Sequence, residues 1–386
     1  MRIGWICLSG IVASESFLHN TLDVLGEIGE VCAVSGVSDG ERKSSREHHY
    51  IPFAEHPLTL IHTLRRKLTG RNVHREQVQG RCRKMTQAVW DGFNPDVFWI
   101  EFGTSAVAAK QMLERSQKPY CIAVHGYDIT TEFKDEDYRR QWVELVNHDL
   151  CIAVICASHY TKRLCVLAGA EEQKCQVIRL ALDGEKIQRD PSIQKTSHPS
   201  FVHFGRLTEK KNPIATFEAF RLVVAKAPNA SITFIGDGPM REELEARVSR
   251  SGLGSQVRVL GAMKQELALQ EVQRHWIFVQ HSVTSKSGDQ EGFALSPAEA
   301  ALMEMPVVST IHNGIPEHVI EGETGFLVRE FDYESMAERM IELAADENQR
   351  KRFGLNGRRN VQFMCARETR LEQLGELLRA QIAESA

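Results

Sequence analysis

Short apolar, often β-branched runs alternate with amphipathic segments of helical length along almost the whole chain. This alternation predicts parallel sheets with helices on both faces, an α/β fold with two doubly wound, Rossmann-like sheets. In the first half the predicted strands are Arg2–Leu8, Val31–Ser35, Asp96–Glu101, Tyr120–Val124, Leu150–Ile155 and Gln176–Arg179. In the second half they are Phe201–Phe204, Ser231–Ile235, Val257–Leu260, Ile277–Gln280, Val307–Ser309 and Gly325–Val328.

A polar stretch containing Pro191 and Pro199 separates the two halves and has no apolar period. A chain of 386 residues is too long for one ordinary core, so two domains are expected. We predict an N-terminal domain at 1–183, a linker at 184–200 and a C-terminal domain at 201–365. The charged amphipathic helix in 366–386 is expected to cross back to the N-terminal domain.

Composition narrows the class of protein. The formal net charge of -4 disfavours a nucleic-acid binder, which is usually basic. Nine irregularly spaced cysteines, many within apolar runs, indicate buried reduced thiols rather than a disulfide framework. The apolar start of the chain is interpreted as a buried strand rather than a signal peptide, and no run of 18 apolar residues follows. We therefore expect a cytoplasmic location.

Two carboxylates eight positions apart follow the predicted strand Ile277–Gln280. Glu291 falls in a loop, and Glu299 falls in the first turn of the next helix. The N–H groups of a helix N terminus bind anions, and a carboxylate accepts hydrogen bonds from vicinal hydroxyls. A nucleotide sugar carries both groups. Two structural interpretations stay open: Glu291 as a solvated loop acid, and Glu299 as the capping-box partner of Ser296, with Pro297 at the first helical position.

Cations follow the predicted strand Phe201–Phe204, where Gly205 leads to Arg206 and Lys211 before a helix. Arg and Lys side chains beside a helix N terminus are suited to phosphate. The alternative is a solvated charged loop.

Other loops follow predicted strands at the edge where open parallel sheets bind ligands. Gly236, Asp237 and Gly238 permit a tight turn and a close backbone approach there, as any strand-to-helix turn can. Gly10 follows the first strand. His125 also ends a strand, where its ring can donate to a sugar hydroxyl or a phosphate, or only pack the loop.

Signatures of other enzyme classes are absent from the sequence. No Gly-x-Gly-x-x-Gly follows the first strand, and there is neither a Walker loop nor a Gly-x-Ser-x-Gly elbow. The His and acidic residues show no metal-ligand spacing, so we expect no metal site.

In this order, the motifs resemble the GT-B glycosyltransferases of glycosyltransferase family 4. The resemblance is clearest from Phe201 to about Glu330 and extends loosely over nearly the whole chain. Its elements are the glutamate–seven–glutamate motif from Glu291 to Glu299, Gly205-Arg206…Lys211, Gly236-Asp-Gly-Pro239, Asn313-Gly-Ile-Pro-Glu317 and Gly322-Glu-Thr-Gly-Phe-Leu-Val. His125-Gly-Tyr-Asp128 and Ser14-Glu-Ser-Phe17 are similar to the exopolysaccharide branch. Gln280-His281-Ser282 departs from the family, which commonly has Pro-Ser there, and Gly10 is a single glycine where many members have two or more.

The resemblance implies two domains facing a central cleft and retaining transfer of a sugar from a UDP- or GDP-sugar. The implied acceptor is a glycan or a lipid-linked sugar in polysaccharide biosynthesis, and no cofactor or bound metal is implied. Arg206 and Lys211 would neutralise the leaving diphosphate, Glu291 would contact the donor sugar, Glu299 would bind the ribose and His125 would lie near the transferred sugar. The other implied donor-binding residues are Gly10, Gly236, Asp237, Gly238, Gly292, Phe293, Ala294 and Leu295.

Two other classes remain as alternatives: a nucleotide-sugar epimerase of the same architecture, and a non-catalytic protein that binds nucleotide sugars as a scaffold. Residues 62–84 raise a separate question, because they hold eight Lys and Arg residues and one acid, Glu76. Apolar residues recur beside them at helical spacing, which predicts basic amphipathic helices. Such helices are either a solvated face or a peripheral contact with an anionic membrane.

Overall fold

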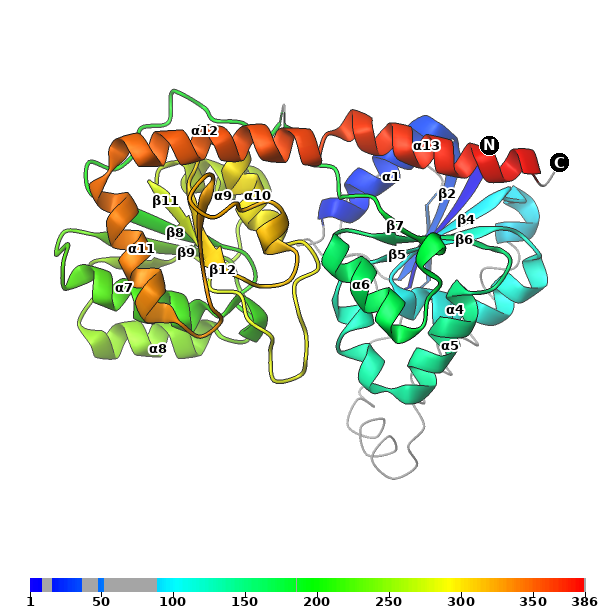
Figure 1. The fold of residues 1–386 in the computed structure, drawn as a ribbon, viewed down its shortest axis with the longest axis horizontal. Helices are drawn as coiled ribbons and strands as arrows, with labels where there is room; N and C mark the ends of the chain where they lie inside the picture. The colour runs from blue at the N-terminus through cyan, green and yellow to red at the C-terminus, as the bar shows by residue number, and fades with distance from the viewer. Residues whose placement is uncertain (9–15, 37–47, 52–88, 185, 385–386) are drawn as a thin grey trace. The chain divides into compact units, whose positions relative to one another are not determined.

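The chain forms two units, each built around its own parallel sheet (Figure 1). One unit consists of Met1–Ala181 and Arg367–Ala386, and the other of Leu182–Ala366. The computed structural model describes residues 1–386 except 9–15, 37–47, 52–88, 185 and 385–386. Gly10 and the basic segment 62–84 therefore lie outside the described residues.

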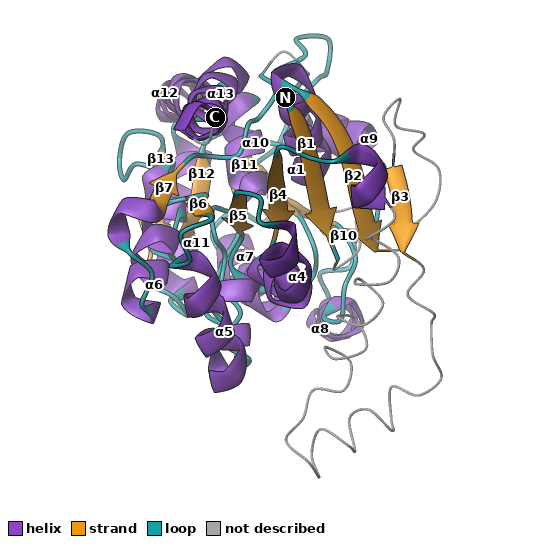
Figure 2. Cartoon of the chain, turned by 90° about the vertical axis from the view of Figure 1, so that its right-hand side faces the viewer, coloured by secondary structure: helices purple, strands orange, loops and turns teal. Residues whose placement is uncertain are grey.

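The first unit contains a seven-stranded sheet in the order β3-β2-β1-β4-β5-β6-β7. Figure 2 shows β3, β2, β1 and β4 side by side. The strands are β1 (Arg2–Cys7), β2 (Glu30–Gly36), β3 (His48–Ile51), β4 (Val97–Glu101), β5 (Tyr120–Val124), β6 (Cys151–Cys156) and β7 (Cys175–Val177). All neighbouring pairs are parallel. The sequence did not predict β3, a short edge strand whose letters His-His-Tyr-Ile lack an apolar run.

Helices of the first unit follow the strands along the chain. They are α1 (Ser16–Ile28), α4 (Gly103–Ser116), α5 (Glu136–Val146), α6 (His159–Ala168) and α13 (Arg367–Glu384), with 3₁₀ helices η1 (Tyr127–Ile129), η2 (Glu132–Lys134) and η3 (Glu172–Lys174). The C-terminal helix α13 belongs to this unit although the whole of the other unit, Leu182–Ala366, precedes it in the chain. Leu374 and Leu378 are buried beside α1, and Arg370 donates to Thr21 Oγ1 at 3.3 Å.

The second unit contains a six-stranded sheet in the order β10-β9-β8-β11-β12-β13, again with parallel pairs. Its strands are β8 (Ser200–Phe204), β9 (Ser231–Ile235), β10 (Val257–Val259), β11 (Ile277–Val279), β12 (Val307–Thr310) and β13 (Gly325–Val328). Its helices are α7 (Pro213–Val224), α8 (Arg241–Ser251), α9 (Gln265–Gln273), α10 (Leu295–Leu302), α11 (Tyr333–Ala345) and α12 (Glu347–Met364), with η4 (Glu209–Lys211) and η5 (Ile315–Glu317). The predicted α/β class with two doubly wound parallel sheets is confirmed.

The segment predicted as a linker, 184–200, lies within the second unit rather than outside both. Because the segment is polar and has no apolar period, its sequence did not predict the contacts that hold it there. Thr196 N–H donates to the Arg274 carbonyl at 2.9 Å, and Trp276 Nε1 donates to the Thr196 carbonyl at 2.9 Å. These bonds attach the segment to the end of α9 and the start of β11.

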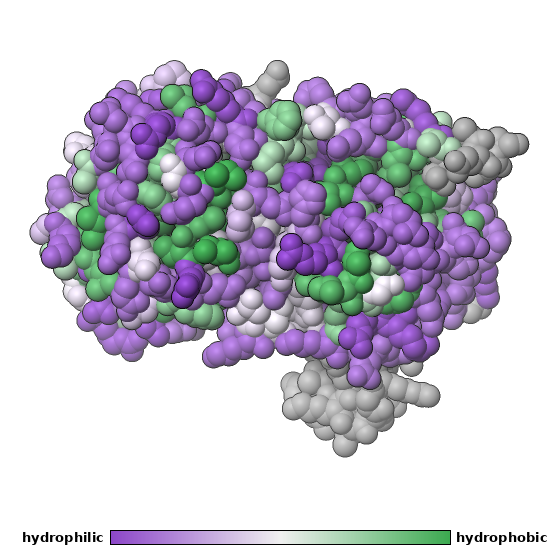
Figure 3. All heavy atoms as spheres, viewed as in Figure 1, coloured by the Kyte–Doolittle hydropathy of each residue, from purple (hydrophilic) through white to green (hydrophobic). Residues whose placement is uncertain are grey.

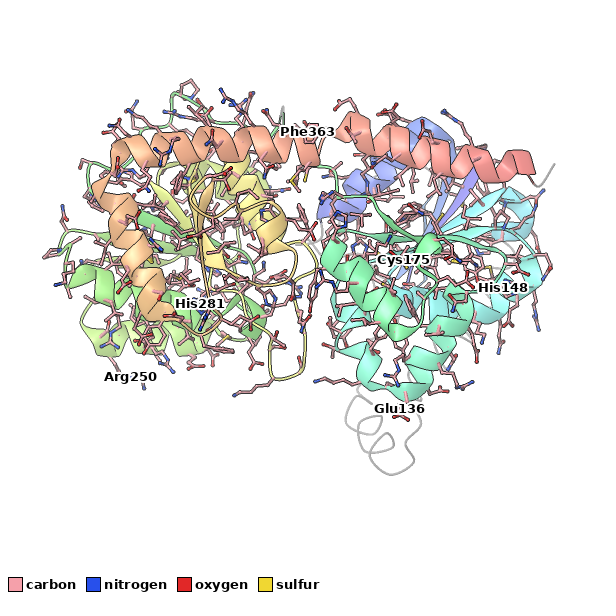
Figure 4. All side chains as sticks on the ribbon, in the orientation of Figure 1. Glu136, His148, Cys175, Arg250, His281 and Phe363 are labelled. Atoms are coloured by element: carbon pink, nitrogen blue, oxygen red, sulfur yellow. The ribbon has the colours of Figure 1, made fainter. Side chains whose placement is uncertain are left out.

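Two expectations from the sequence concern the burial of cysteines and the presence of membrane-spanning helices. The cysteines that the structure describes are all buried, as predicted, and Cys175 lies inside the first unit on β7 (Figure 4). Within the described part of the chain, no helix is long and apolar enough to span a bilayer. The face that Figure 3 shows is mostly hydrophilic over both units, with apolar side chains scattered between.

Candidate active site

The candidate site of the second unit lies where its strand order reverses. From β8 the chain builds outward to β9 and β10, and from β11 it builds in the other direction to β12 and β13. Ligands of open α/β sheets bind beyond the carboxyl ends of the strands at such a switch point. The loops that leave β8 and β11 carry Lys211 and Glu291 respectively, so the topology brings the two motifs together.

The loop after β8 is shaped by local sequence. Gly205 has φ of +144°, a region that side chains other than glycine rarely adopt. A Cβ there would lie 3.2 Å from Lys211 side-chain carbons and 3.3 Å from Ser296 Oγ, so Lys211 lies beside the first turn of α10. Asn212 then caps α7, accepting from Ala215 N–H at 3.1 Å, and this cap fixes the residue next to Lys211.

Lys211 and Glu291 form an ion pair with Nζ and Oε1 2.9 Å apart. Both residues are buried, with 9% and 8% of their surfaces exposed. Burial alone would raise the pKa of Glu291, but the charges of Lys211 and Lys210 outweigh it and lower that pKa to about 2. The solvated-loop interpretation of Glu291 is therefore wrong, because this carboxylate is buried and paired.

Two neighbours complete the surroundings of the pair. Lys210 lies 3.1 Å from Asp289 of the loop that carries Glu291. His203 is fully buried on β8, and burial, with the charge of Lys211, lowers its pKa to about 3. A neutral imidazole there adds no second cation beside Lys211. His203 was not among the predicted site residues, because its only sequence signal is a histidine inside an apolar strand.

The first turn of α10 differs from the predicted capping box. The helix begins at Leu295, Ala294 occupies the cap position with φ of +63°, and no side chain caps it. Ser296 and Pro297 therefore lie inside the helix, and the capping-box interpretation of Glu299 is wrong. Glu299 is instead buried and accepts from Gln265 Nε2 at 3.0 Å. Burial raises its pKa, while Gln265 and the charge of Lys211 act in the opposite direction.

The unusual Gln280-His281-Ser282 segment follows β11 and is fully buried, with His281 labelled in Figure 4. Gln280 Nε2 donates to Ser282 Oγ at 2.8 Å, and Ser296 Oγ donates to Gln280 Oε1 at 3.4 Å. Burial lowers the pKa of His281 to about 4. The segment thus contacts the first turn of α10 through a side chain that a Pro-Ser pair would lack.

Other predicted donor residues flank this centre. Gly292, Phe293 and Ala294 are buried directly before α10, and His318 Nε2 donates to the Phe293 carbonyl at 2.9 Å. Leu295 opens the helix.

The loops after β9 and β8 hold the remaining predicted donor residues of this unit. Gly236 N–H donates to the Gly261 carbonyl at 2.8 Å. Asp237 accepts from Gly238 N–H at 2.7 Å and pairs with Arg241 at 2.7 Å. Arg206 is exposed, and no described residue forms an ion pair with it.

In the first unit, His125 lies at the carboxyl end of β5 and contacts a carboxylate that sequence reasoning missed. His125 Nε2 is 2.7 Å from Glu101 Oε2, at the end of β4. Glu101 is fully buried, and its other oxygen accepts from Trp99 Nε1 at 2.8 Å and Trp5 Nε1 at 3.3 Å. The two indole donors thus occupy Oε1, and Oε2 is the oxygen that faces the His125 ring. The only indication of Glu101 in the sequence was its place as an acidic residue at the end of an apolar strand.

Asp128 orders the turn that carries His125. Its Oδ1 accepts from the N–H groups of His125 and Gly126, each at 3.0 Å, and its Oδ2 accepts from Gly103 N–H at 2.8 Å. The rings of Phe17 and Phe102 each lie 4.7 Å from the imidazole. His125 is therefore fixed by the fold rather than free in a loop. No cluster of three or more potential metal ligands occurs among the residues that the structure describes.

Comparisons with known proteins identify the relatives of this chain. Residues 184–360 match the family described as "Glycosyl transferases group 1". The amylovoran biosynthesis glycosyltransferase AmsK of Erwinia amylovora is 26% identical over 291 residues, 74% of this chain and 70% of that protein. The putative colanic acid biosynthesis glycosyltransferase WcaL of Escherichia coli K12 is 24% identical over 367 residues, 88% of this chain and 90% of that protein.

Solved structures share the fold. HepE of Anabaena, in complex with UDP and glucose, superposes with a TM-score of 0.79 at 19% identity, covering 98% of this chain and 99% of that one. Sucrose-phosphate synthase of Thermosynechococcus elongatus gives a TM-score of 0.80 at 18% identity over the whole of both chains. The fold is therefore GT-B. The chain carries a glycosyltransferase group 1 domain, and it is a glycosyltransferase.

Proposed function

We propose that this enzyme transfers a sugar, with retention of anomeric configuration, from a UDP- or GDP-sugar to a glycan or lipid-linked acceptor in polysaccharide biosynthesis. The observation that carries the proposal is the buried Lys211–Glu291 ion pair beside the first turn of α10, with Glu299 inside that helix. The names of AmsK and WcaL support the polysaccharide pathway. The complex of HepE with UDP and glucose supports a nucleoside diphosphate donor.

In this proposal the donor site holds its positive charges in position before the reaction begins, so that they stabilise the leaving group as it becomes negative. A diphosphate at the N terminus of α10 meets free helix N–H groups and the Lys211 ammonium, and both stabilise the negative charge that grows on the leaving group. Arg206, exposed on the same loop, adds a second cation. Glu299 accepts hydrogen bonds from the ribose hydroxyls, and Glu291 accepts them from the donor sugar.

The first unit supplies the acceptor side in this proposal. His125, oriented by Glu101, lies near the transferred sugar in this proposal. We also propose that the enzyme is cytoplasmic and that residues 62–84 contact an anionic membrane, where a lipid-linked acceptor is presented. This part rests on composition, because those residues lie outside the described part of the chain.

The function is tested by incubating the protein with radiolabelled UDP-, GDP- and ADP-sugars and a mixture of glycan and lipid-linked acceptors. We expect one donor to release nucleoside diphosphate and label an acceptor, and NMR of the product to show the anomeric configuration of the donor. Glu291→Gln is the matched control against contaminating activity. Interconversion of nucleotide sugars without transfer indicates the epimerase, and binding without turnover indicates the scaffold.

Metal dependence is an added arm of the same experiment. We propose that no bound metal is required, because Lys211, Arg206 and the helix N–H groups together offer the leaving diphosphate positive charge. Transfer is expected to continue in EDTA. Loss of transfer in EDTA that magnesium or manganese restores would contradict this proposal.

A further inference from the structure

The loop between β11 and α10, residues 283–291, carries Glu291 but has no regular secondary structure of its own. Its shape depends on contacts with other elements. Val283 N–H donates to the Lys210 carbonyl at 2.8 Å, and within the loop Ser285 N–H donates to the Asp289 carbonyl at 3.0 Å. Neither of these two bonds involves Glu291 itself.

One carboxylate after β13, Glu330, reaches both ends of this loop. At the beginning, Thr284 N–H donates to Glu330 Oε2 at 2.8 Å. At the end the contact passes through His312, which follows β12. His312 Nδ1 is 2.6 Å from Glu330 Oε1, and Glu291 N–H donates to His312 Nε2 at 3.2 Å. Glu330 therefore holds Thr284 directly and Glu291 through a buried imidazole.

The donors around His312 determine its tautomer. Glu291 N–H and Asn313 Nδ2, which lies 3.0 Å away, both approach Nε2 as donors. Nε2 is consequently the unprotonated acceptor, and Nδ1 carries the hydrogen that it donates to Glu330. A carboxylate suits this place because it accepts from Thr284 and from His312 at the same time.

The turn that carries Glu330 is itself constrained. Phe331 has φ of +67°, which is unfavourable for a side chain of this size. Asp332 N–H donates to the Arg329 carbonyl at 3.2 Å, and Asp332 caps α11 by accepting from Ser335 N–H at 2.9 Å. A strained residue flanked by these bonds thus directly follows Glu330, and such strain occurs often at functional sites.

We propose that Glu330 is a positioning residue of the transfer reaction, acting through His312 to set Glu291 against Lys211. The inference rests on the proposed role of Glu291 toward the donor sugar. It adds the loops after β12 and β13 to a site otherwise built from the loops after β8 and β11. Glu330 contacts the loop backbone and His312 in this scheme, not the donor.

Glu330→Gln is the decisive variant because it keeps the shape and removes one acceptor. The amide NH₂ must face either Thr284 N–H or His312 Nδ1–H, and both are donors. If His312 changes tautomer instead, its Nε2–H faces the N–H of Glu291. One end of the loop is therefore released in either arrangement. Glu338→Gln, an exposed acid on α11, is the matched control with the same change of charge.

We expect Glu330→Gln to lower kcat on the order of 10- to 100-fold, as a misplaced catalytic group does, while affinity for the free nucleoside diphosphate stays unchanged. His312→Asn should have a similar effect, and the double variant should be no worse than the more damaging single variant, because both act through one contact. Glu338→Gln should match the wild type. A kcat for Glu330→Gln equal to that of Glu338→Gln overturns the proposal.

Two measurements need no turnover and separate this inference from the proposed function. Nitrogen NMR of the wild type should show His312 as the Nδ1–H tautomer, and amide exchange at Thr284 and Glu291 should accelerate in Glu330→Gln. Unchanged exchange at both amides contradicts the inference even in an active enzyme. Wild-type protein that transfers from none of the donors contradicts the proposed function, while the exchange result still decides whether Glu330 positions the loop.

Discussion

The ammonium of Lys211 lies 2.9 Å from the carboxylate of Glu291, although the two residues belong to loops that leave different strands. Both are buried, so each charge depends on the other for its stability. The two cations of the β8 loop therefore have different environments, because Lys211 is buried in this pair and Arg206 is exposed. The two residues should therefore respond differently to replacement.

Lys211→Ala should reduce both stability and turnover. Removing the cation leaves Glu291 buried beside only Lys210, and loss of one partner of a buried pair costs about 3 kcal/mol of unfolding free energy. Arg206→Ala should change stability by less than about 0.5 kcal/mol, as exposed substitutions do, yet still reduce turnover. Urea unfolding and donor turnover measure the two effects. Equal stability of both variants would show that the ion pair does not stabilise the fold.

The same pair predicts a pH dependence of stability. The pKa of Glu291 is lowered from 4.5 to about 2 in the folded protein, so folding favours its ionised form. This stabilisation is complete above the unfolded pKa and is lost as the pH falls from 4.5 toward 2. The wild type should therefore lose stability relative to Glu291→Gln between about pH 5 and pH 2. An unchanged difference in unfolding free energy over this interval contradicts the folded-state pKa.

Glu299→Gln tests the ribose contact directly. A glutamine retains the shape and the contact with Gln265 but loses the charge that strengthens hydrogen bonds from hydroxyls. Affinity for the nucleoside diphosphate should fall on the order of tenfold, measured by calorimetry. Gln265→Ala is the control, because it removes the protein partner and leaves the carboxylate. Unchanged affinity in Glu299→Gln would assign Glu299 a structural role.

Glu101→Gln tests the acceptor side. The two indole donors would keep the amide oxygen, so the NH₂ would face His125 and force its ring into the other tautomer. Turnover should fall on the order of 10- to 100-fold. Nucleoside diphosphate affinity should not change, because Glu299 and Lys211 lie in the other unit. Glu136→Gln, an exposed acid on α5 labelled in Figure 4, should behave as wild type in both assays.

Membrane contact through residues 62–84 is tested by sedimentation with liposomes that contain anionic lipid. Each surface cation adds about 1 kcal/mol of attraction, and salt weakens it. The wild type should pellet at low salt and remain in solution at high salt. Replacing Arg65, Arg66 and Lys67 with glutamine should reduce pelleting. Wild-type protein that stays in the supernatant at low salt makes this segment a solvated face.

Local sequence determined the strands and most helices of both units. Apolar runs such as Phe201–Phe204 are long enough to be recognised alone, and alternation with amphipathic segments leads to parallel sheets. The same regularity placed Lys211 and Glu291 after strands, at the edge where ligands bind. Helix α12 was not predicted from the sequence, because its sequence is polar and contains Gly354 and Gly357. A Cβ on Gly354 would overlap the Glu304 carbonyl oxygen, so α12 depends on close packing rather than on its own propensity.

Partners distant in sequence were decided by the tertiary structure alone. The sequence shows Glu291 and Glu299 eight positions apart, but their environments differ because Lys211 pairs with one and Gln265 donates to the other. Glu101 and Glu330 look like ordinary acids at strand ends. They become positioning candidates only because parallel strands bring the ends of β4 and β5, or of β12 and β13, side by side. A linear pattern reports which face of an element is buried, whereas strand order decides which polar ends meet.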